Sequence, residues 1–241
     1  MTGFVYEIFA SIQGEGIYCG QRQTFVRLAG CNLACDYCDT PAAREPNPPT
    51  CQVELVPGSG DITLIENPMT AEHVVGYCRG FERNVVTITG GEPLVQADFV
   101  EILLGELKTA GLLTHLETNG TLFRELAGVI RQVDVVAMDM KLASAAGDGE
   151  LWDEHSRFLE IASGTQVFVK VVVSASTTED EIRRCGDLIA FVDRHIPLVI
   201  QPVTGANAPP GELLLRLQDA AAEKLADARV IPQCHKALGL K

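Results

Sequence analysis

Three cysteines within one short stretch have the residue type and spacing of a metal-binding site. Cys31, Cys35 and Cys38 are spaced C-x3-C-x2-C, directly after a segment expected to be a strand. Three thiolates on one loop can converge on one metal centre, and soft sulfur ligands select zinc or an iron–sulfur cluster. A structural zinc site needs a fourth protein ligand, and the closest candidates, Cys19 and Cys51, do not form a pair. The spacing therefore favours a [4Fe–4S] cluster with one iron open to a small molecule.

The residues alone leave two simpler interpretations of these cysteines open. The three thiols could bind no metal, or they could form an incomplete zinc knuckle in a non-catalytic interaction module. Metal analysis separates these possibilities, because a cluster contains iron with inorganic sulfide, whereas a zinc module contains zinc without sulfide. The other cysteines are expected to act as small apolar residues or exposed thiols.

A polar segment ahead of the cysteines has residue types suited to a small anionic ligand. The stretch 13–16, Gln-Gly-Glu-Gly, is too polar and flexible for a core. The amide of Gln13 offers donors and acceptors, and exposed glycine N–H groups can bind a carboxylate. Arg27, on the strand that leads into the cysteine loop, could clamp a carboxylate with two hydrogen bonds. The simpler interpretations are a turn at 13–16 and a solvent-facing charge at Arg27.

These residues must be positioned by a chain that alternates β-branched runs with helical patterns. From position 85, strand starts recur at roughly 28 to 34 residues, the length of a βα unit, which implies a parallel sheet. We expect one α/β domain over residues 1–241, folded as a partial, open β/α barrel of about six units with an N-terminal extension. The expected strands cover 24–28, 85–89, 113–117, 133–138, 167–173, 198–201 and 229–231, and the expected helices cover 71–79, 99–110, 122–131, 179–194 and 211–226.

The segment 41–69 does not fit this alternation. It contains six prolines and begins immediately after the cysteine motif. Such a composition predicts a long irregular insertion. Long loops of this kind are often functional, and this one is placed where it could cover the site.

The loops that follow the later strands are also candidates for the site, because chemistry in parallel βα folds sits at the carboxyl ends of strands. In the loop 89–93, two glycines let the backbone approach a ligand, and the carboxylate of Glu92 could hold an ammonium group. The loop 117–121 combines polar residues with an Asn-Gly turn, and the loop 139–141 carries an Asp and a Lys. The loop 201–204 follows a further strand, so it is expected at the same edge of the sheet. Turn formation, helix capping and a surface salt bridge are the simpler interpretations.

Composition and charge narrow the classes of protein further. Apolar residues make up 46% and charged residues 21% of the chain, which is globular composition. The net charge of −13 argues against a nucleic-acid partner bound by general electrostatics. No apolar run reaches the ~18 residues of a membrane span. The start has no secretory signal pattern, so we expect a cytoplasmic protein without a disulfide framework.

The cysteine motif resembles that of the radical S-adenosylmethionine (SAM) enzymes. The aromatic residue typical of the position before the third cysteine is present as Tyr37. In that superfamily three cysteines hold a [4Fe–4S] cluster, and SAM chelates the fourth iron and is cleaved to a 5′-deoxyadenosyl radical. Glycyl-radical-activating enzymes share the motif but act on a protein, so binding of a small pterin would discriminate them.

Further motifs resemble the 7-carboxy-7-deazaguanine synthase family and span nearly the whole chain. They are IQGEG at 12–16, FVRLAGCN at 25–32, CDT at 38–40, TGGEP at 89–93, ETNGT at 117–121 and PQCHK at 232–236. The family converts 6-carboxy-5,6,7,8-tetrahydropterin to 7-carboxy-7-deazaguanine with loss of ammonia, in queuosine-type 7-deazapurine biosynthesis. The resemblance also implies Mg²⁺, an electron donor such as flavodoxin or ferredoxin, and a homodimer, with neither nucleic acid nor membrane as a partner.

The resemblance assigns expected roles residue by residue. Cys31, Cys35 and Cys38 would hold the cluster, and Thr40 would bind Mg²⁺. The substrate contacts would be Ile12, Gln13, Gly14, Glu15, Arg27, Thr89 and His235. The SAM contacts would be Tyr37, Cys38, Asp39, Gly90, Gly91, Glu92, Thr118, Asn119, Asp139, Met140, Lys141, Gln201, Pro202, Val203 and Thr204. Many members have Ser-Pro-Lys where this chain has Asp139-Met140-Lys141, so only the lysine matches there.

Overall fold

A ten-stranded sheet forms the centre of the computed structural model, which describes residues 1–147 and 149–240. A role for the C-terminal Lys241 therefore lies outside the described residues. The strand order is β12-β11-β10-β9-β8-β7-β3-β2-β4-β5. Neighbours from β3 to β12 are parallel, whereas β2 runs antiparallel to β3. The strands β5 and β12 stand at the two ends of this order and do not pair with each other. The sheet is therefore an open partial barrel, which confirms the expected fold class.

The strands of this sheet have the following bounds: β2 Val5–Ile12, β3 Arg22–Leu28, β4 Thr50–Glu54, β5 Ile62–Glu66, β7 Val85–Gly90, β8 Leu113–Thr118, β9 Val135–Asp139, β10 Gln166–Val173, β11 Leu198–Pro202 and β12 Ala228–Val230. A separate pair joins β1 Thr2–Gly3 to β6 Met69–Thr70. The helices are α1 Ala71–Gly80, α2 Ala97–Thr109, α3 Phe123–Val129, α4 Ala143–Ala146, α5 Trp152–Ala162, α6 Glu179–Asp193, α7 Gly211–Ala222 and α8 Cys234–Leu238. Short 3-10 helices cover Gly16–Tyr18, Pro41–Arg44, Pro93–Gln96 and Ile130–Gln132.

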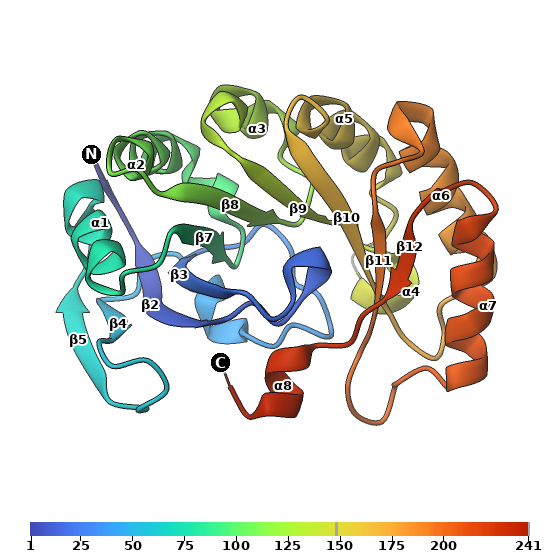
Figure 1. Cartoon of the computed structure of the whole chain (residues 1–241), viewed down its shortest axis with the longest axis horizontal. Coiled ribbons are helices and arrows are strands. Elements are labelled where there is room, and N and C mark those ends of the chain that lie inside the picture. The colour runs from blue at the N-terminus through green and yellow to red at the C-terminus, as the bar shows by residue number, and fades with distance from the viewer. Residues whose placement is uncertain (148, 241) are drawn as a thin grey trace.

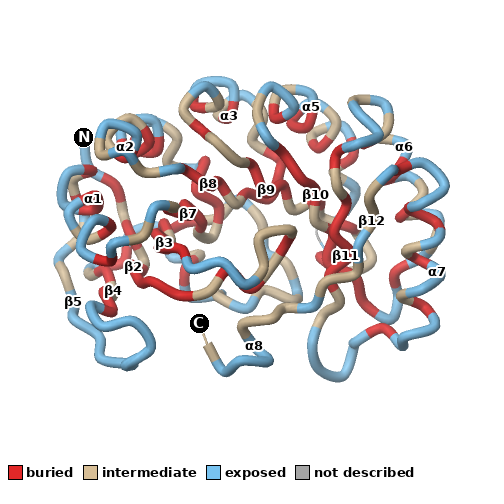
Figure 2. Tube along the Cα trace, viewed as in Figure 1, coloured by how far each residue is buried: buried red, intermediate tan, exposed pale blue. Residues whose placement is uncertain are grey.

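The larger helices cover the outer side of the curved sheet. Figure 1 shows α1, α2, α3, α5, α6 and α7 along this side, with α8 and the C-terminal end on the inner side. The parallel strands are buried on their helix-facing side, and Figure 2 shows buried residues along the strands and on the helix surfaces that face them. In α7, Leu213, Leu217 and Ala221 form a buried apolar stripe. A capping box of Thr178 and Glu181 starts α6.

The structure differs from the expectation for segment 41–69, which is not irregular throughout. Residues 50–54 form β4 and residues 62–66 form β5, and this hairpin extends the sheet at the edge beyond β2. Alternation buries Cys51 and Val53 there, but the surrounding prolines mask this short pattern in the sequence. The side chain of Asn67 ties the segment down by donating to Val5 O at 2.8 Å and Pro48 O at 3.1 Å.

Two further elements were not expected from the sequence. The N-terminal extension contains β2, a mostly buried strand in the middle of the sheet order, and residues 152–162 form α5. His155 on α5 is fully buried. In the part of the chain that is described, no helix is long and apolar enough to cross a membrane.

Candidate active site

A cavity of about 320 Å³ opens at the carboxyl ends of the parallel strands. Its wall joins the end of β2, the cysteine loop, the loops after β7 to β11, and the C-terminal segment 233–236. The fold therefore brings together residues that are more than two hundred positions apart. Of the predicted site residues, the following line the cavity: Ile12, Gln13, Gly14, Glu15, Arg27, Cys31, Cys35, Tyr37, Cys38, Asp39, Thr40, Thr89, Gly90, Gly91, Thr118, Asn119, Asp139, Lys141, Gln201, Pro202, Val203, Thr204 and His235.

The cysteine loop is held in place by its polar neighbours. The amide of Asn32 donates to Thr121 Oγ1 at 2.9 Å and accepts from Asn119 Nδ2 at 2.8 Å, which fastens the loop to the one after β8. Arg44 Nη2 donates to the carbonyl of Cys35 at 2.7 Å. The loop thus has a fixed path even though it contains no regular secondary structure.

The donor set of this loop fits an iron–sulfur cluster better than a single zinc ion. Cys31, Cys35 and Cys38 are all half-buried and all face the same cavity. Thiolates on one tetrahedral zinc lie about 4 Å apart, because each Zn–S bond is about 2.3 Å. Among the described residues, the three cysteines do not form a group whose ligand atoms all lie within 4.8 Å of one another. A wider spacing suits a [4Fe–4S] cluster, in which each thiolate binds a different iron.

Two glycines after β7 let the backbone pass directly behind the cysteine loop. A Cβ atom on Gly91 would lie 2.3 Å from Gly30 O and 2.8 Å from Cys31 Cβ. A Cβ on Gly90 would lie 2.7 Å from Leu28 O. Because both contacts are with backbone or with a cysteine of the motif, no larger residue fits without displacing the loop.

Glu92 and Met140 are the predicted SAM contacts that do not line the cavity. Glu92 is fully buried and accepts hydrogen bonds from Leu94 N at 3.0 Å, Thr118 Oγ1 at 2.9 Å and Asn119 N at 2.7 Å. Burial raises the pKa of Glu92 to about 7, against the lowering effect of these bonds. The carboxylate therefore joins the loops after β7 and β8 and does not reach the cavity, while Met140 packs in the core.

A chain of half-buried charges lines the cavity. Asp139 Oδ2 lies 2.9 Å from Lys141 Nζ and 3.2 Å from Lys170 Nζ. Lys141 also donates to Tyr37 OH at 3.0 Å. Burial lowers the pKa of Lys141, but the charge of Asp139 outweighs this effect and raises the pKa well above its usual value. Asp139 Oδ1 and Gln201 Oε1 are buried without a hydrogen-bond partner, so both can accept from a ligand in the cavity.

Glu15 continues this chain toward the C-terminal segment. It pairs with Lys170 and accepts from Gln233 Nε2 at 2.6 Å. Burial alone would raise the pKa of Glu15, but the ion pair and these hydrogen bonds lower it to about 2. The sequence analysis did not single out Lys170, and it included Gln233 in a motif without giving it a role. A lysine inside the apolar run VFVKVVV was the available signal for Lys170.

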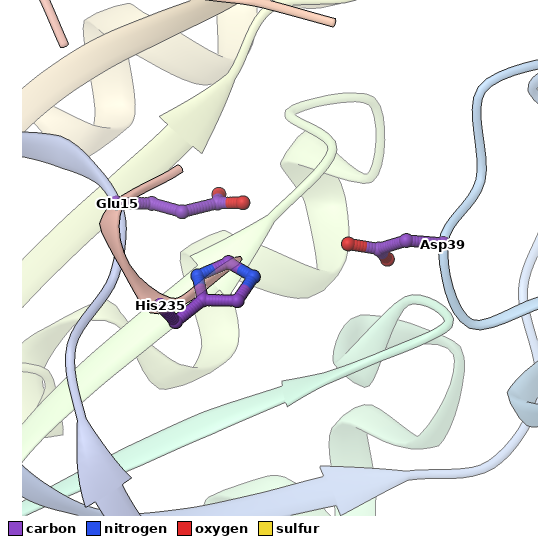
Figure 3. A group of neighbouring side chains, drawn as sticks. All are labelled: Glu15, Asp39 and His235. Carbon is purple, nitrogen blue, oxygen red and sulfur yellow. The ribbon is translucent and has the colours of Figure 1, made fainter. Parts of the chain in front are cut away.

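Glu15, Asp39 and His235 point toward one another across the mouth of the cavity, as Figure 3 shows. One ligand atom of each lies within 4.8 Å of the others. Thr40 lines the same wall and donates to Asp39 Oδ1 at 3.2 Å. Carboxylate and hydroxyl oxygens suit Mg²⁺, which commonly completes its shell with water and substrate. Asp39 and Thr40 fit such a site, whereas Glu15 is already paired.

Gln13 and Arg27 bring to the cavity wall groups that can recognise a planar polar ligand. Gln13 Nε2 donates to Glu117 Oε1 at 2.8 Å, and Gln13 Oε1 accepts from Glu15 N at 3.1 Å. Arg27 is held by Glu7 through an Nε–Oε1 contact of 2.9 Å. The guanidinium therefore has a fixed direction and still lines the cavity.

Several residues at or behind the cavity wall were not among the predicted site residues. His155 Nε2 accepts from Lys141 N at 3.3 Å and lies 3.2 Å from Asn119 O, so a helix on the outer side braces two lining loops. Burial lowers the pKa of His155 to about 4, which keeps the ring neutral at pH 7. The remaining additions to the lining include Phe9, Phe25, Arg44, Glu117, Phe168, Lys170, Gln233 and Lys236.

Comparisons with known proteins agree with this geometry. The model of the radical SAM superfamily matches residues 25–172. A 7-carboxy-7-deazaguanine synthase of Geobacter sulfurreducens is 43% identical over 97% of this chain and 96% of its own length. A protein of the same name from Methanothermobacter thermautotrophicus is 36% identical over 100% of this chain and 99% of its own length.

A solved structure shows the same fold. The crystal structure of QueE from Escherichia coli superimposes with a TM-score of 0.63 and covers 98% of this chain and 95% of its own. The sequence identity of that pair is 22%, so this likeness speaks for the fold alone.

Proposed function

We propose a reaction for this chain from the premise that it belongs to the radical SAM superfamily and to its 7-carboxy-7-deazaguanine synthase family. The proposed reaction converts 6-carboxy-5,6,7,8-tetrahydropterin to 7-carboxy-7-deazaguanine with loss of ammonia. One observation carries the proposal. The same cavity is lined by the three-cysteine loop, by the guanidinium of Arg27, which could clamp a carboxylate, and by the amide of Gln13. A small polar acid bound there lies next to the group that starts the reaction.

The cluster and SAM, when bound, supply the one-electron chemistry and the carbon radical that starts the rearrangement. Cys31, Cys35 and Cys38 would hold the cluster. The open acceptors Asp139 Oδ1 and Gln201 Oε1 would take hydrogen bonds from SAM. Glu92 would act indirectly, by keeping the loops at 90–91 and 118–119 in register.

The substrate would be oriented by the wall opposite the cysteines. Arg27 would take the substrate carboxylate, because a guanidinium matches a carboxylate in charge and in geometry. Gln13 would present its amide to the pterin ring. Ile12, Gly14, Thr89 and His235 would complete the pocket, with Glu15 fixing the segment that carries His235 through Gln233.

A magnesium ion would sit at Thr40 and Asp39, between the cysteine loop and the substrate. The cation would neutralise developing negative charge and orient a substrate oxygen. The required electron would come from a flavodoxin or ferredoxin. We further propose a homodimer and a cytoplasmic location, where such reductants are available. The downstream use would be queuosine-type 7-deazapurine biosynthesis.

Anaerobic mass spectrometry of a single reaction tests this function. The mixture contains the reconstituted protein, SAM, reductant, Mg²⁺ and 6-carboxy-5,6,7,8-tetrahydropterin. We expect 7-carboxy-7-deazaguanine from the unsubstituted chain and none from Cys35→Ala. Cys78→Ala is the matched control, because Cys78 is buried in α1 away from the cavity and its loss should leave the product.

Formation of 5′-deoxyadenosine without the deazaguanine would leave the radical SAM chemistry standing and would show that the substrate is wrong. If neither product forms from protein with verified iron and sulfide, both the substrate and the cofactor proposals fail.

A further inference from the structure

Arg44 is a cation beside the cysteine loop that the family motifs do not include. It lies at the end of the 3-10 helix Pro41–Arg44, within the segment after the cysteine motif. Its Nη2 donates to Cys35 O at 2.7 Å, and its side chain lines the cavity together with all three cysteines. No ion pair joins Arg44 to a carboxylate among the residues that the structure describes.

The main chain holds Arg44 in this place from both sides. Ala43 O accepts from Gly30 N at 2.8 Å, and Ala43 N donates to Thr40 O at 3.0 Å. Gly30, the residue before Cys31, has a φ of +89°, and a Cβ there would lie 3.7 Å from Pro46. The 3-10 helix is therefore fastened to both ends of the cysteine loop, and Ala43 at its centre is fully buried.

The guanidinium also lies within electrostatic reach of the three thiols. Cys38 raises the pKa of Arg44 against the lowering effect of burial, and the charges of Cys35 and Cys31 raise it further. Lys141 is another cation near the cysteines, but Asp139 offsets its charge, with Oδ2 at 2.9 Å from Lys141 Nζ. Arg44 thus brings a positive charge that no carboxylate offsets to the rim of the cysteine loop.

We propose that Arg44 is a positioning residue of the iron–sulfur site, which holds the backbone of Cys35, places a positive charge beside the three cysteines and raises the reduction potential of the cluster. The inference rests on the cluster named under the proposed function. Reduction adds one electron, from a flavodoxin, a ferredoxin or dithionite, and no bond is made or broken. Because this electron adds negative charge to a centre that already carries three thiolates, a nearby cation stabilises the reduced form more than the oxidised form.

Potentiometric titration monitored by electron paramagnetic resonance, without SAM, tests the proposal in the full-length reconstituted protein. Arg44→Gln keeps a hydrogen-bond donor and removes the charge, and we expect its potential to shift to a more negative value. Arg44→Lys keeps the charge, so its potential should lie between those of Arg44→Gln and the unsubstituted chain. Arg22→Gln removes an exposed charge from the far end of β3 and should leave the potential unchanged.

Iron and sulfide content is measured for every variant before titration. Loss of the cluster from Arg44→Gln but not from Arg44→Lys would support a requirement for the charge. Equal potentials in Arg44→Gln and the unsubstituted chain, at equal cluster content, would overturn the proposal, as would equal potentials in Arg44→Gln and Arg44→Lys. If the unsubstituted chain assembled no cluster, the proposed function would fail together with this inference.

Discussion

Single residues at the cavity are held by partners from distant parts of the chain. Glu15 is the clearest case, because Lys170 and Gln233 reach it across 155 and 218 positions of sequence. These contacts lower its pKa to about 2 from an ordinary 4.5. A carboxylate with a lowered pKa stabilises the fold above its unfolded pKa, and the contribution is lost as pH falls.

Replacing this carboxylate should therefore change how stability depends on pH. We expect Glu15→Gln to lower the free energy of unfolding by about 1 to 3 kcal/mol at neutral pH. The difference from the unsubstituted chain should stay constant down to about pH 4.5 and then narrow as the pH approaches 2. Urea unfolding of the cluster-free chain between pH 8 and pH 3 measures this. Glu160→Gln, at an exposed position on α5, is the control. If the free energy of unfolding of Glu15→Gln stayed parallel to that of the unsubstituted chain down to pH 3, the prediction would be contradicted.

At the scale of elements, the C-terminal segment closes the cavity without contributing to the core. Residues 233–236 supply Gln233, His235 and Lys236 to the cavity wall, and Cys234 N donates to Gly14 O at 2.8 Å. None of the residues of α8 is buried. The segment is therefore fastened to the loop after β2 by polar contacts, and little hydrophobic free energy depends on it.

Truncation after Ile231 separates these two roles. The shortened chain should unfold at nearly the same urea concentration as the full chain. Its dissociation constant for the pterin should rise at least about tenfold, because contacts worth about 1.4 kcal/mol or more are lost. Binding of SAM should change much less, since most of its proposed contacts lie on strand-end loops. Isothermal titration calorimetry measures the dissociation constants for the pterin and for SAM. An equal loss of affinity for both ligands would contradict a role of the segment in pterin binding alone.

At the scale of the molecule, one sheet and one large apolar cluster extend through most of the described chain. The cluster includes residues from β2 at one end and from α7 at the other, and the sheet passes without interruption from β5 to β12. Such continuity predicts one folding unit. The expected single domain over residues 1–241 follows from the same continuity and awaits measurement.

Unfolding should therefore occur in one cooperative transition despite a length at which intermediates are common. Trp152 is the only tryptophan and lies on α5, whereas circular dichroism reports all the helices. We expect the urea midpoints of tryptophan fluorescence and of circular dichroism to coincide. A fluorescence transition separated from the ellipticity transition would show that the half containing α5 unfolds independently.

The sequence by itself determined the cluster-binding chemistry and the βα architecture. Cys31, Cys35 and Cys38 share one short loop, so their spacing alone limits what they can bind, and the period of the apolar runs depends only on local geometry. The strand-end rule then placed most of the predicted site residues on one rim, and the structure brings them to one cavity. Their individual roles remain predictions.

Only the tertiary structure decided which polar groups face the cavity and which are buried behind it. Glu92 turns away to join two loops, while Lys170 enters from a position without any motif, and Gln233 from a motif that assigned it no role. The hairpin of β4 and β5 likewise became visible only through its pairing with β2. In each case the deciding contacts join residues far apart in sequence, because burial and charge compensation depend on the packed fold and leave no periodic signal along the chain.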